Sequence, residues 1–155
     1  MVFKIFFQGA LKLSFECADR VGSPLVIAND PDSDRLAVAE KVGGVWRVFS
    51  GNEVGTLLAH WCLTQYRLKH PHVEAKKLLF VNTVVSSKMM SAIAQKEGIR
   101  YEECLTGFKW IGDLSLRLAK EEGCVLLLGF EQAIGYMVMI ARLWEKSSIV
   151  FSHCF

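Results

Sequence analysis

The sequence lacks the patterns that would assign it to a secreted or membrane class. Its five cysteines are odd in number, widely spaced and never arranged as C-x-x-C, which fits a reducing cytoplasm better than a disulfide framework. No apolar stretch approaches the length of a membrane span. The apolar residues 1–7 are too few for a signal peptide and are not followed by a clean cleavage site. We therefore expect a cytoplasmic protein without a membrane partner.

A strong charge bias and the commonest catalytic motifs are also missing. The net charge is +2 with lysine and arginine spread along the chain, which argues against a nucleic-acid partner. There is no G-x-G-x-x-G, Walker A or G-x-S-x-G pattern, and His70 and His72 have no third ligand for zinc. With 155 residues, of which 52% are hydrophobic, the chain is long and apolar enough for a folded domain.

The most informative segment that is present is residues 28–35, Ala-Asn-Asp-Pro-Asp-Ser-Asp-Arg. It follows an apolar run that predicts a buried strand ended by a turn. Three carboxylates at alternate positions, Asp30, Asp32 and Asp34, would repel one another unless a cation neutralised them. Oxygen ligands without a nearby cysteine or histidine suit Mg²⁺, Mn²⁺ or Ca²⁺. Arg35 beside them could hold a phosphate.

This segment has two other interpretations besides a metal site. Aspartate and proline are ordinary turn residues, so a solvated loop, with Arg35 in a surface salt bridge, is the plain alternative. An EF-hand loop would need glycine at its sixth position and glutamate at its twelfth. This chain has Arg35 and Lys41 there, so the EF-hand is excluded.

Helix and strand patterns alternate along the chain. Apolar residues at helical spacing, closed by glycine or proline, predict the helices, and short apolar runs predict the strands. The expected elements are helices over 10–22, 53–69, 87–97 and 110–121, strands over 24–28, 77–82, 99–104 and 125–129, and a hairpin of 36–40 with 45–50. Asn52 is predicted to cap the second helix. This alternation predicts a layered α/β domain.

Ligand sites in such domains lie beyond the carboxyl ends of strands, and a second polar loop occupies that position. The strand over 125–129 runs into the loop that carries Glu131, whose plain alternative role is that of a solvated carboxylate. The segment Thr106-Gly107-Phe108-Lys109 precedes the last predicted helix. Lys109 there could equally be an exposed helix-start lysine, and Gly107 could serve turn geometry alone.

Three segments, in the same order, resemble the α-D-phosphohexomutases, the family of phosphoglucomutases and phosphomannomutases. Residues 30–35 resemble the Asp-x-Asp-x-Asp-Arg metal loop of that family, and residues 106–112 resemble its Thr-Gly-x-Lys segment. Residues 130–136 resemble its sugar-binding loop, most closely the Glu-Glu-Ala-Ile-Gly of the phosphopentomutase-like branch. Gln132 departs from that branch, and Ala133 replaces the serine of many hexose mutases, so the preferred sugar stays open.

The resemblance implies a Mg²⁺-dependent isomerase that interconverts 1-phosphates with 5- or 6-phosphates of pentoses or glucose, with a sugar bisphosphate as activator. The implied metal ligands are Asp30, Asp32 and Asp34, and the implied substrate-binding residues are Arg35, Thr106, Gly107, Lys109 and Glu131. Arg35 would steady the phosphoryl group, and Glu131 would accept hydrogen bonds from sugar hydroxyls. The phosphosugar is the implied partner.

The resemblance also implies a phosphoglucomutase-like fold, α/β/α with a mixed sheet, that is incomplete. Residues 1–50 would be the end of a metal-binding second domain, and residues 51–155 most of a sugar-binding third domain, with 138–155 divergent. The phosphoserine loop of the family, Thr-Ala-Ser-His-Asn-Pro, and its Arg-x-Ser-Gly-Thr phosphate clamp have no counterpart. We therefore expect no catalytic nucleophile and no turnover by this chain alone. The alternative hypothesis is a truncated module that binds Mg²⁺ or sugar phosphate, or pairs with a full-length mutase, without catalysis.

Overall fold

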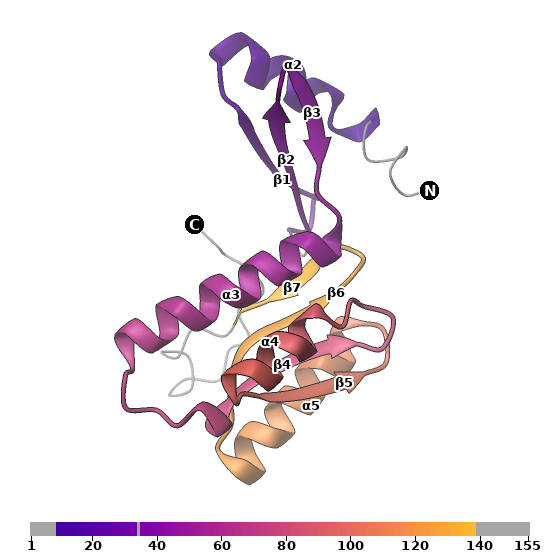
Figure 1. The fold of residues 1–155 in the computed structure, drawn as a ribbon. Helices are drawn as coiled ribbons and strands as arrows, with labels where there is room; N and C mark the ends of the chain where they lie inside the picture. The colour runs from indigo at the N-terminus through magenta and orange to yellow at the C-terminus, as the bar shows by residue number, and fades with distance from the viewer. Residues whose placement is uncertain (1–8, 34, 139–155) are drawn as a thin grey trace.

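The computed structural model of the chain describes residues 9–33 and 35–138. These residues form two sheets, one of three strands and one of four, which lie at opposite ends of an elongated arrangement (Figure 1). We call residues 9–49 the N-terminal unit and residues 50–138 the C-terminal unit. In the part of the chain that is described, no helix is both long and apolar enough to cross a membrane.

The N-terminal unit is one helix followed by an antiparallel meander in the order β1-β2-β3. Its elements are α2 (Lys12–Val21), β1 (Leu25–Asn29), β2 (Leu36–Val42) and β3 (Val45–Val48). Gly22 ends α2 in the left-handed conformation, as predicted. Gly43 and Gly44 form the hairpin turn with φ of 57° and 82°, and two consecutive positive φ angles explain why both are glycine.

One face of this three-stranded sheet is covered by α2. Ala18 of α2 packs with Val26 of β1 and Ala39 of β2 in a small buried cluster. Phe15 stacks on Trp46 with ring centroids 4.9 Å apart, which extends the contact to β3. The unit therefore has a core of its own, but a small one.

The opposite face of the sheet corrects one prediction. The apolar residues 24–28 predicted a buried strand, yet Leu25 and Ile27 of β1 are 47% and 49% exposed. Only Val26, which points toward α2, is fully buried. Successive strand residues face opposite sides, so a strand with a helix on one side alone buries alternate residues.

The C-terminal unit is a four-stranded mixed sheet in the order β5-β4-β6-β7. Its elements are α3 (Gly51–Lys69), η1 (Ala75–Lys77), β4 (Leu78–Thr83), α4 (Met89–Glu97), β5 (Arg100–Cys104), α5 (Phe108–Glu122), β6 (Val125–Glu131) and β7 (Gly135–Met137). Strand β4 is parallel to β5 and β6, and β7 is antiparallel to β6.

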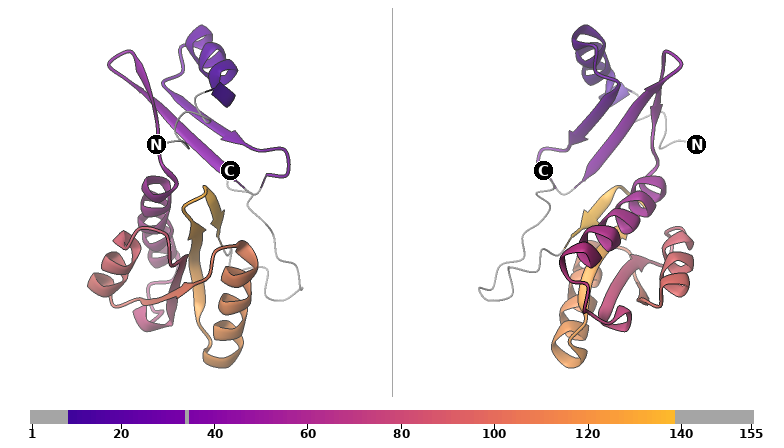
Figure 2. Two further views of the ribbon diagram at one scale, coloured as in Figure 1. Left: turned by 90° about the vertical axis from the view of Figure 1, so that its right-hand side faces the viewer. Right: turned by 60° about the vertical axis from the view of Figure 1, so that its left-hand side comes forward.

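Helices cover both faces of this sheet, as the two views in Figure 2 show. All six residues of β4 are buried. Phe80 and Phe130 pack on one face beneath α3 and α4, and Val81 and Leu126 pack on the other beneath α5. The predicted layered α/β/α arrangement with a mixed sheet is confirmed.

Two local predictions in this unit need revision. Helix α3 is capped by Ser50, not Asn52: the Ser50 hydroxyl accepts the Glu53 N–H, and the Glu53 carboxylate accepts the Ser50 N–H at 2.7 Å. This reciprocal pair satisfies two backbone donors at the start of the helix. The short strand β7 was not predicted, because three residues are too few to show a strand period.

Candidate functional site

The loop between β1 and β2 carries the predicted metal ligands. Asp30 is half-buried; its Oδ1 accepts the Arg35 N–H at 3.1 Å, and its Oδ2 lies 3.6 Å from the Arg35 Nε. Ser33, at φ 59°, donates its N–H to the Asp30 carbonyl at 3.0 Å. Asp32 is exposed, and Asp34 lies outside the described residues. The loop is thus a tight turn in which Asp30 and Arg35 are already paired.

The chemistry of this loop suits a hard cation. Asp30 and Asp32 offer only oxygen donors, which Mg²⁺ prefers. Across residues 9–33 and 35–138, no three histidine, cysteine, aspartate or glutamate side chains are grouped closely enough to hold a metal. The described carboxylates therefore supply two of the three predicted ligands, and the third is the undescribed Asp34.

The second loop brings two predicted residues into contact. Glu131, the last residue of β6, is half-buried, and its Oε2 accepts the Gly107 N–H at 3.1 Å. Gly107 has a φ of 114°, which a residue with a side chain rarely adopts. Gly107 therefore serves both the turn geometry and the placement of the Glu131 carboxylate.

The other two residues predicted in this segment flank Gly107 and are open to solvent. Thr106 lies in the loop after β5 and is exposed. Lys109 lies in the first turn of α5 and is also exposed, with its Nζ 5.4 Å from the centroid of the Trp110 ring. Both side chains are therefore open to a ligand that approaches from solvent.

A thiol lies close to the Glu131 carboxylate. Cys104 ends β5 and donates its Sγ–H to the Asn82 carbonyl at 3.7 Å. Burial, together with the negative charge of Glu131, raises the pKa of the Cys104 thiol. The thiol stays neutral near pH 7, so it places no second negative charge beside Glu131.

The two loops are joined through their backbones. Arg35 and Gly135 form an isolated antiparallel bridge, and the Leu36 N–H donates to the Ile134 carbonyl at 2.9 Å. A Cβ on Gly135 would lie 2.1 Å from the Phe108 ring, so only glycine fits there. The predicted metal loop and the predicted sugar loop, which are distant in sequence, are therefore neighbours in the fold.

The turn after β4 was not part of the predicted site, yet it contacts the sugar loop. The Ser86 hydroxyl accepts the Gln132 N–H at 3.1 Å, and Ser86 is 6% exposed. The sequence signal that could have indicated this turn is its position, because Thr83 and Ser86 come at the carboxyl end of a buried strand, where ligand sites form. The partner could not be read from the sequence, since Gln132 belongs to a distant segment.

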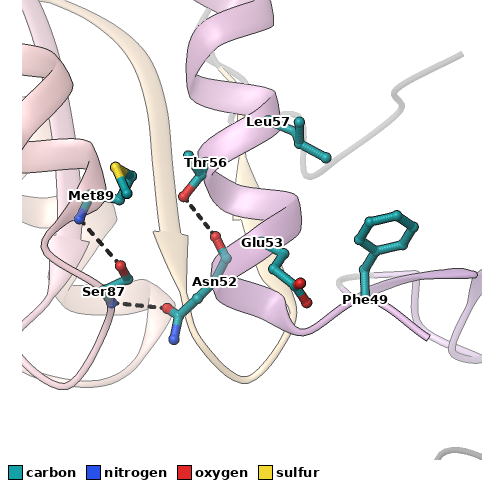
Figure 3. Close-up of a pocket in the computed structure, with 7 residues that line it drawn as sticks. All are labelled: Phe49, Asn52, Glu53, Thr56, Leu57, Ser87 and Met89. Atoms are coloured by element: carbon teal, nitrogen blue, oxygen red, sulfur yellow. Dashed lines mark hydrogen bonds between the residues drawn. The ribbon is translucent and has the colours of Figure 1, made fainter. Parts of the chain in front are cut away.

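A pocket of about 380 Å³ lies between the start of α3 and the turn before α4 (Figure 3). It is lined by Phe49, Asn52, Glu53, Thr56, Leu57, Ser87 and Met89. In Figure 3 the Asn52 side chain bridges the two elements, with its Oδ1 accepting the Ser87 N–H at 2.9 Å. None of the predicted site residues lines this pocket.

Sequence comparison relates the chain to phosphosugar enzymes. The phosphoglucomutase/phosphomannomutase alpha/beta/alpha domain III model matches residues 50–152. Phosphopentomutase of Mus musculus is 50% identical over 132 residues, which are 84% of this chain and 21% of the relative. Glucose 1,6-bisphosphate synthase of Mus musculus is 40% identical over 131 residues, again 84% of this chain and 21% of the relative. The chain thus spans about a fifth of the length of these relatives.

Structural comparison agrees at the level of the fold. N-acetylphosphoglucosamine mutase of Aspergillus fumigatus, solved with GlcNAc-6P and magnesium, superposes with a TM-score of 0.55 at 17% identity. The match covers 79% of this chain and 24% of that chain. The resemblance drawn from the three loops is therefore confirmed, and the chain belongs to the phosphoglucomutase/phosphomannomutase family, whose members are phosphosugar mutases.

Proposed function

We propose that this chain is the metal-binding and sugar-binding portion of a phosphosugar mutase that prefers pentose phosphates as substrates. One observation carries the proposal: the Arg35–Gly135 bridge brings an acidic loop and a loop with a sugar-binding pattern together. A mutase needs both, because phosphoryl transfer depends on charge neutralisation and on positioning of the sugar. The preference for pentoses is supported by the identity to a phosphopentomutase.

In this proposal Asp30, Asp32 and Asp34 hold Mg²⁺, which neutralises charge on the phosphoryl group. Arg35, already 3.6 Å from Asp30 through its Nε, lies where it can donate to phosphate oxygens. The Asp30 carboxylate attracts both a metal ion and the Arg35 guanidinium, so a metal ion bound here competes with Arg35 for Asp30. Affinity for the metal alone should therefore be modest.

Sugar hydroxyls are the proposed ligands of Glu131. One of its oxygens accepts the Gly107 N–H, so the other is available as an acceptor for a hydroxyl. Thr106, in the loop before α5, and Lys109, in the first turn of α5, are the further proposed substrate contacts. A sugar bisphosphate would occupy the same contacts as activator.

The division of the chain follows from this assignment. Residues 1–50 would belong to a metal-binding domain and residues 51–155 to a sugar-binding domain, with 138–155 divergent. A cytoplasmic location is part of the proposal, on the number and spacing of the cysteines. The missing domains of a full-length mutase are the natural partner.

A non-catalytic module is the second candidate, and one sequence observation favours it for the isolated chain. No phosphoserine loop is present to carry the phosphoryl group between two positions. Binding and turnover therefore separate: we expect this chain to bind Mg²⁺ and phosphosugar but not to convert ribose 1-phosphate or glucose 1-phosphate.

The test is a titration of the full chain with ribose 5-phosphate, followed by backbone NMR, beside a mutase assay with Mg²⁺ and glucose 1,6-bisphosphate. Binding should shift the amides of Gly107 and Gln132, and Glu131→Gln should weaken it about tenfold through loss of a charged acceptor. Glu121→Gln, an exposed carboxylate on α5, is the matched control and should bind normally. Binding that is unchanged by Glu131→Gln would overturn the proposed sugar-binding role, and turnover by this chain would overturn the expectation that it is inactive alone.

A further inference from the structure

Two buried hydroxyls lie at the carboxyl end of β4 beside the sugar loop. Thr83 is fully buried and Ser86 is 6% exposed. Their Oγ atoms are 2.8 Å apart, and the Ser86 N–H donates to the Thr83 carbonyl at 2.9 Å, which closes a tight turn. A buried hydroxyl must be satisfied by a partner, so this pair is held in a defined geometry.

The Ser86 hydroxyl extends from this turn to the sugar loop. It accepts the N–H of Gln132 at 3.1 Å. Gln132 is bonded to Glu131, whose carboxylate accepts the Gly107 N–H at 3.1 Å. A continuous path of contacts therefore runs from Ser86 through the backbone at 131–132 to Gly107.

Helix α3 supports the same loop from another side. The Tyr136 hydroxyl donates to the Gly51 carbonyl at 3.0 Å, and Tyr136 is buried. A Cβ on Gly51 would lie 2.1 Å from the Gln132 carbonyl oxygen, so the helix start is in close backbone contact with the loop. These contacts hold the loop as a whole, whereas the Ser86 hydroxyl accepts the backbone N–H of Gln132, the residue next to Glu131.

We propose that Ser86 is a positioning residue that holds Glu131 in place for a sugar hydroxyl. This proposal rests on the function proposed for Glu131. The Ser86 hydroxyl fixes the backbone at Gln132, and that backbone in turn sets where the Glu131 carboxylate lies. Ser86 itself does not contact the sugar.

A purely structural role for Ser86 would leave a different signature. If Ser86 only satisfied the Gln132 N–H, its loss would lower the free energy of unfolding without moving Glu131. Gly107 separates the two roles, because its N–H donates to the Glu131 carboxylate and not to Ser86. A displaced carboxylate weakens that bond and exposes the Gly107 amide to solvent exchange.

The experiment measures solvent exchange of the Gly107 amide by NMR in the full chain. Glu131→Ala sets the upper limit, and Ser86→Ala should raise the exchange rate about fivefold, the equivalent of about one ordinary hydrogen bond. Ser86→Thr keeps the hydroxyl and should restore the slow rate. Ser115→Ala removes another buried hydroxyl, one that donates to Ile111 within α5, and should change stability but not Gly107 exchange.

A second variant and a binding measurement test the positioning role of Ser86 independently. Thr83→Val removes the partner of the Ser86 hydroxyl and should give a smaller increase, even if Ser86→Ala folds poorly. The dissociation constant for ribose 5-phosphate should rise in Ser86→Ala and recover in Ser86→Thr. If the unaltered chain binds no ribose 5-phosphate, the proposed function fails, while Gly107 exchange still decides whether Ser86 positions Glu131. Slow Gly107 exchange in both Ser86→Ala and Thr83→Val would overturn the positioning role.

Discussion

The two units of this chain carry neighbouring loops but are built very differently. In the C-terminal unit, helices cover both faces of the sheet, and every residue of β4 is buried. In the N-terminal unit, α2 covers one face, and Leu25 and Ile27 on the other face are about half exposed. Burial of apolar area is the main source of stability, so the C-terminal unit should be the firmer of the two.

The same contrast holds for the two loops. The sugar loop is fastened by Ser86, by Gly107 and by the Tyr136–Gly51 contact. The metal loop is fastened within itself by Asp30 and Arg35, and to the C-terminal unit by the bridge at Gly135. The predicted sugar loop is therefore held by several contacts within the C-terminal unit, whereas the predicted metal loop depends on its bridge to that unit.

Core substitutions should give the largest difference between the units. Phe80→Ala in β4 should lower the free energy of unfolding by about 3–5 kcal/mol, because it leaves a cavity in a fully buried core. Ile27→Ala on the open face should cost about 1 kcal/mol, since its side chain is half exposed. Urea denaturation measures both. Equal costs would show that the face bearing Ile27 is covered.

Hydrogen exchange should separate the units without any substitution. Amides of β4 and β6 should exchange only through global opening, and those of α2 and the β2–β3 hairpin should exchange faster through local opening. Native-state exchange followed by mass spectrometry measures this. Uniform protection across both units in a monomer would contradict the comparison.

Loss of the helix cap at the junction between the units should have a smaller effect on the free energy of unfolding. Ser50 caps α3 just where the N-terminal unit ends, and Ser50→Ala should lower the free energy of unfolding by about 1 kcal/mol. Thr64→Ala, whose hydroxyl bonds within the exposed face of α3, is the matched control and should change much less. A cost for Ser50→Ala no larger than that of Thr64→Ala would argue against the cap.

The smallest expected effect is the pH dependence from Glu53. Hydrogen bonds from the Ser50 backbone, then its hydroxyl, and the nearby Arg47 hold the pKa of Glu53 below the usual glutamate value. A carboxyl with a lowered folded pKa stabilises the fold above its unfolded pKa, and that stability is lost as the pH falls through the folded value. Unfolding free energies measured down through this acidic range should fall less steeply for Glu53→Gln than for the unaltered chain. Identical slopes would contradict this prediction.

The sequence predicts the C-terminal unit more fully than the N-terminal one, for a physical reason. Strands β4 and β6 are continuous apolar runs, and such runs predict burial on both faces. Strand β1 is also an apolar run, but its burial depends on whether a second layer covers it, which no local pattern records.

The site shows the same division between local and non-local signals. Asp30 and Glu131 could be predicted as site residues from the sequence, because each lies at the end of an apolar run in a recognisable loop pattern. The Ser50–Glu53 cap was also readable, as serine followed by glutamate three residues later, and was missed. The Ser86–Gln132 bond and the Arg35–Gly135 bridge join distant segments, so the fold alone reveals them.

If the predicted metal loop and the predicted sugar loop form one site, as we propose, a bound Mn²⁺ ion should lie close to both. Paramagnetic broadening of backbone NMR signals reports which amides lie near a bound ion. A Glu16→Ala/Asp113→Ala variant, which removes two exposed carboxylates elsewhere, serves as the charge-matched control. We predict that Mn²⁺ broadens residues 30–35 together with Ile134 and Gly135, and that Asp30→Ala/Asp32→Ala abolishes both effects while the control retains them. Broadening confined to the first loop, or unchanged in the Asp30→Ala/Asp32→Ala variant, would contradict the account.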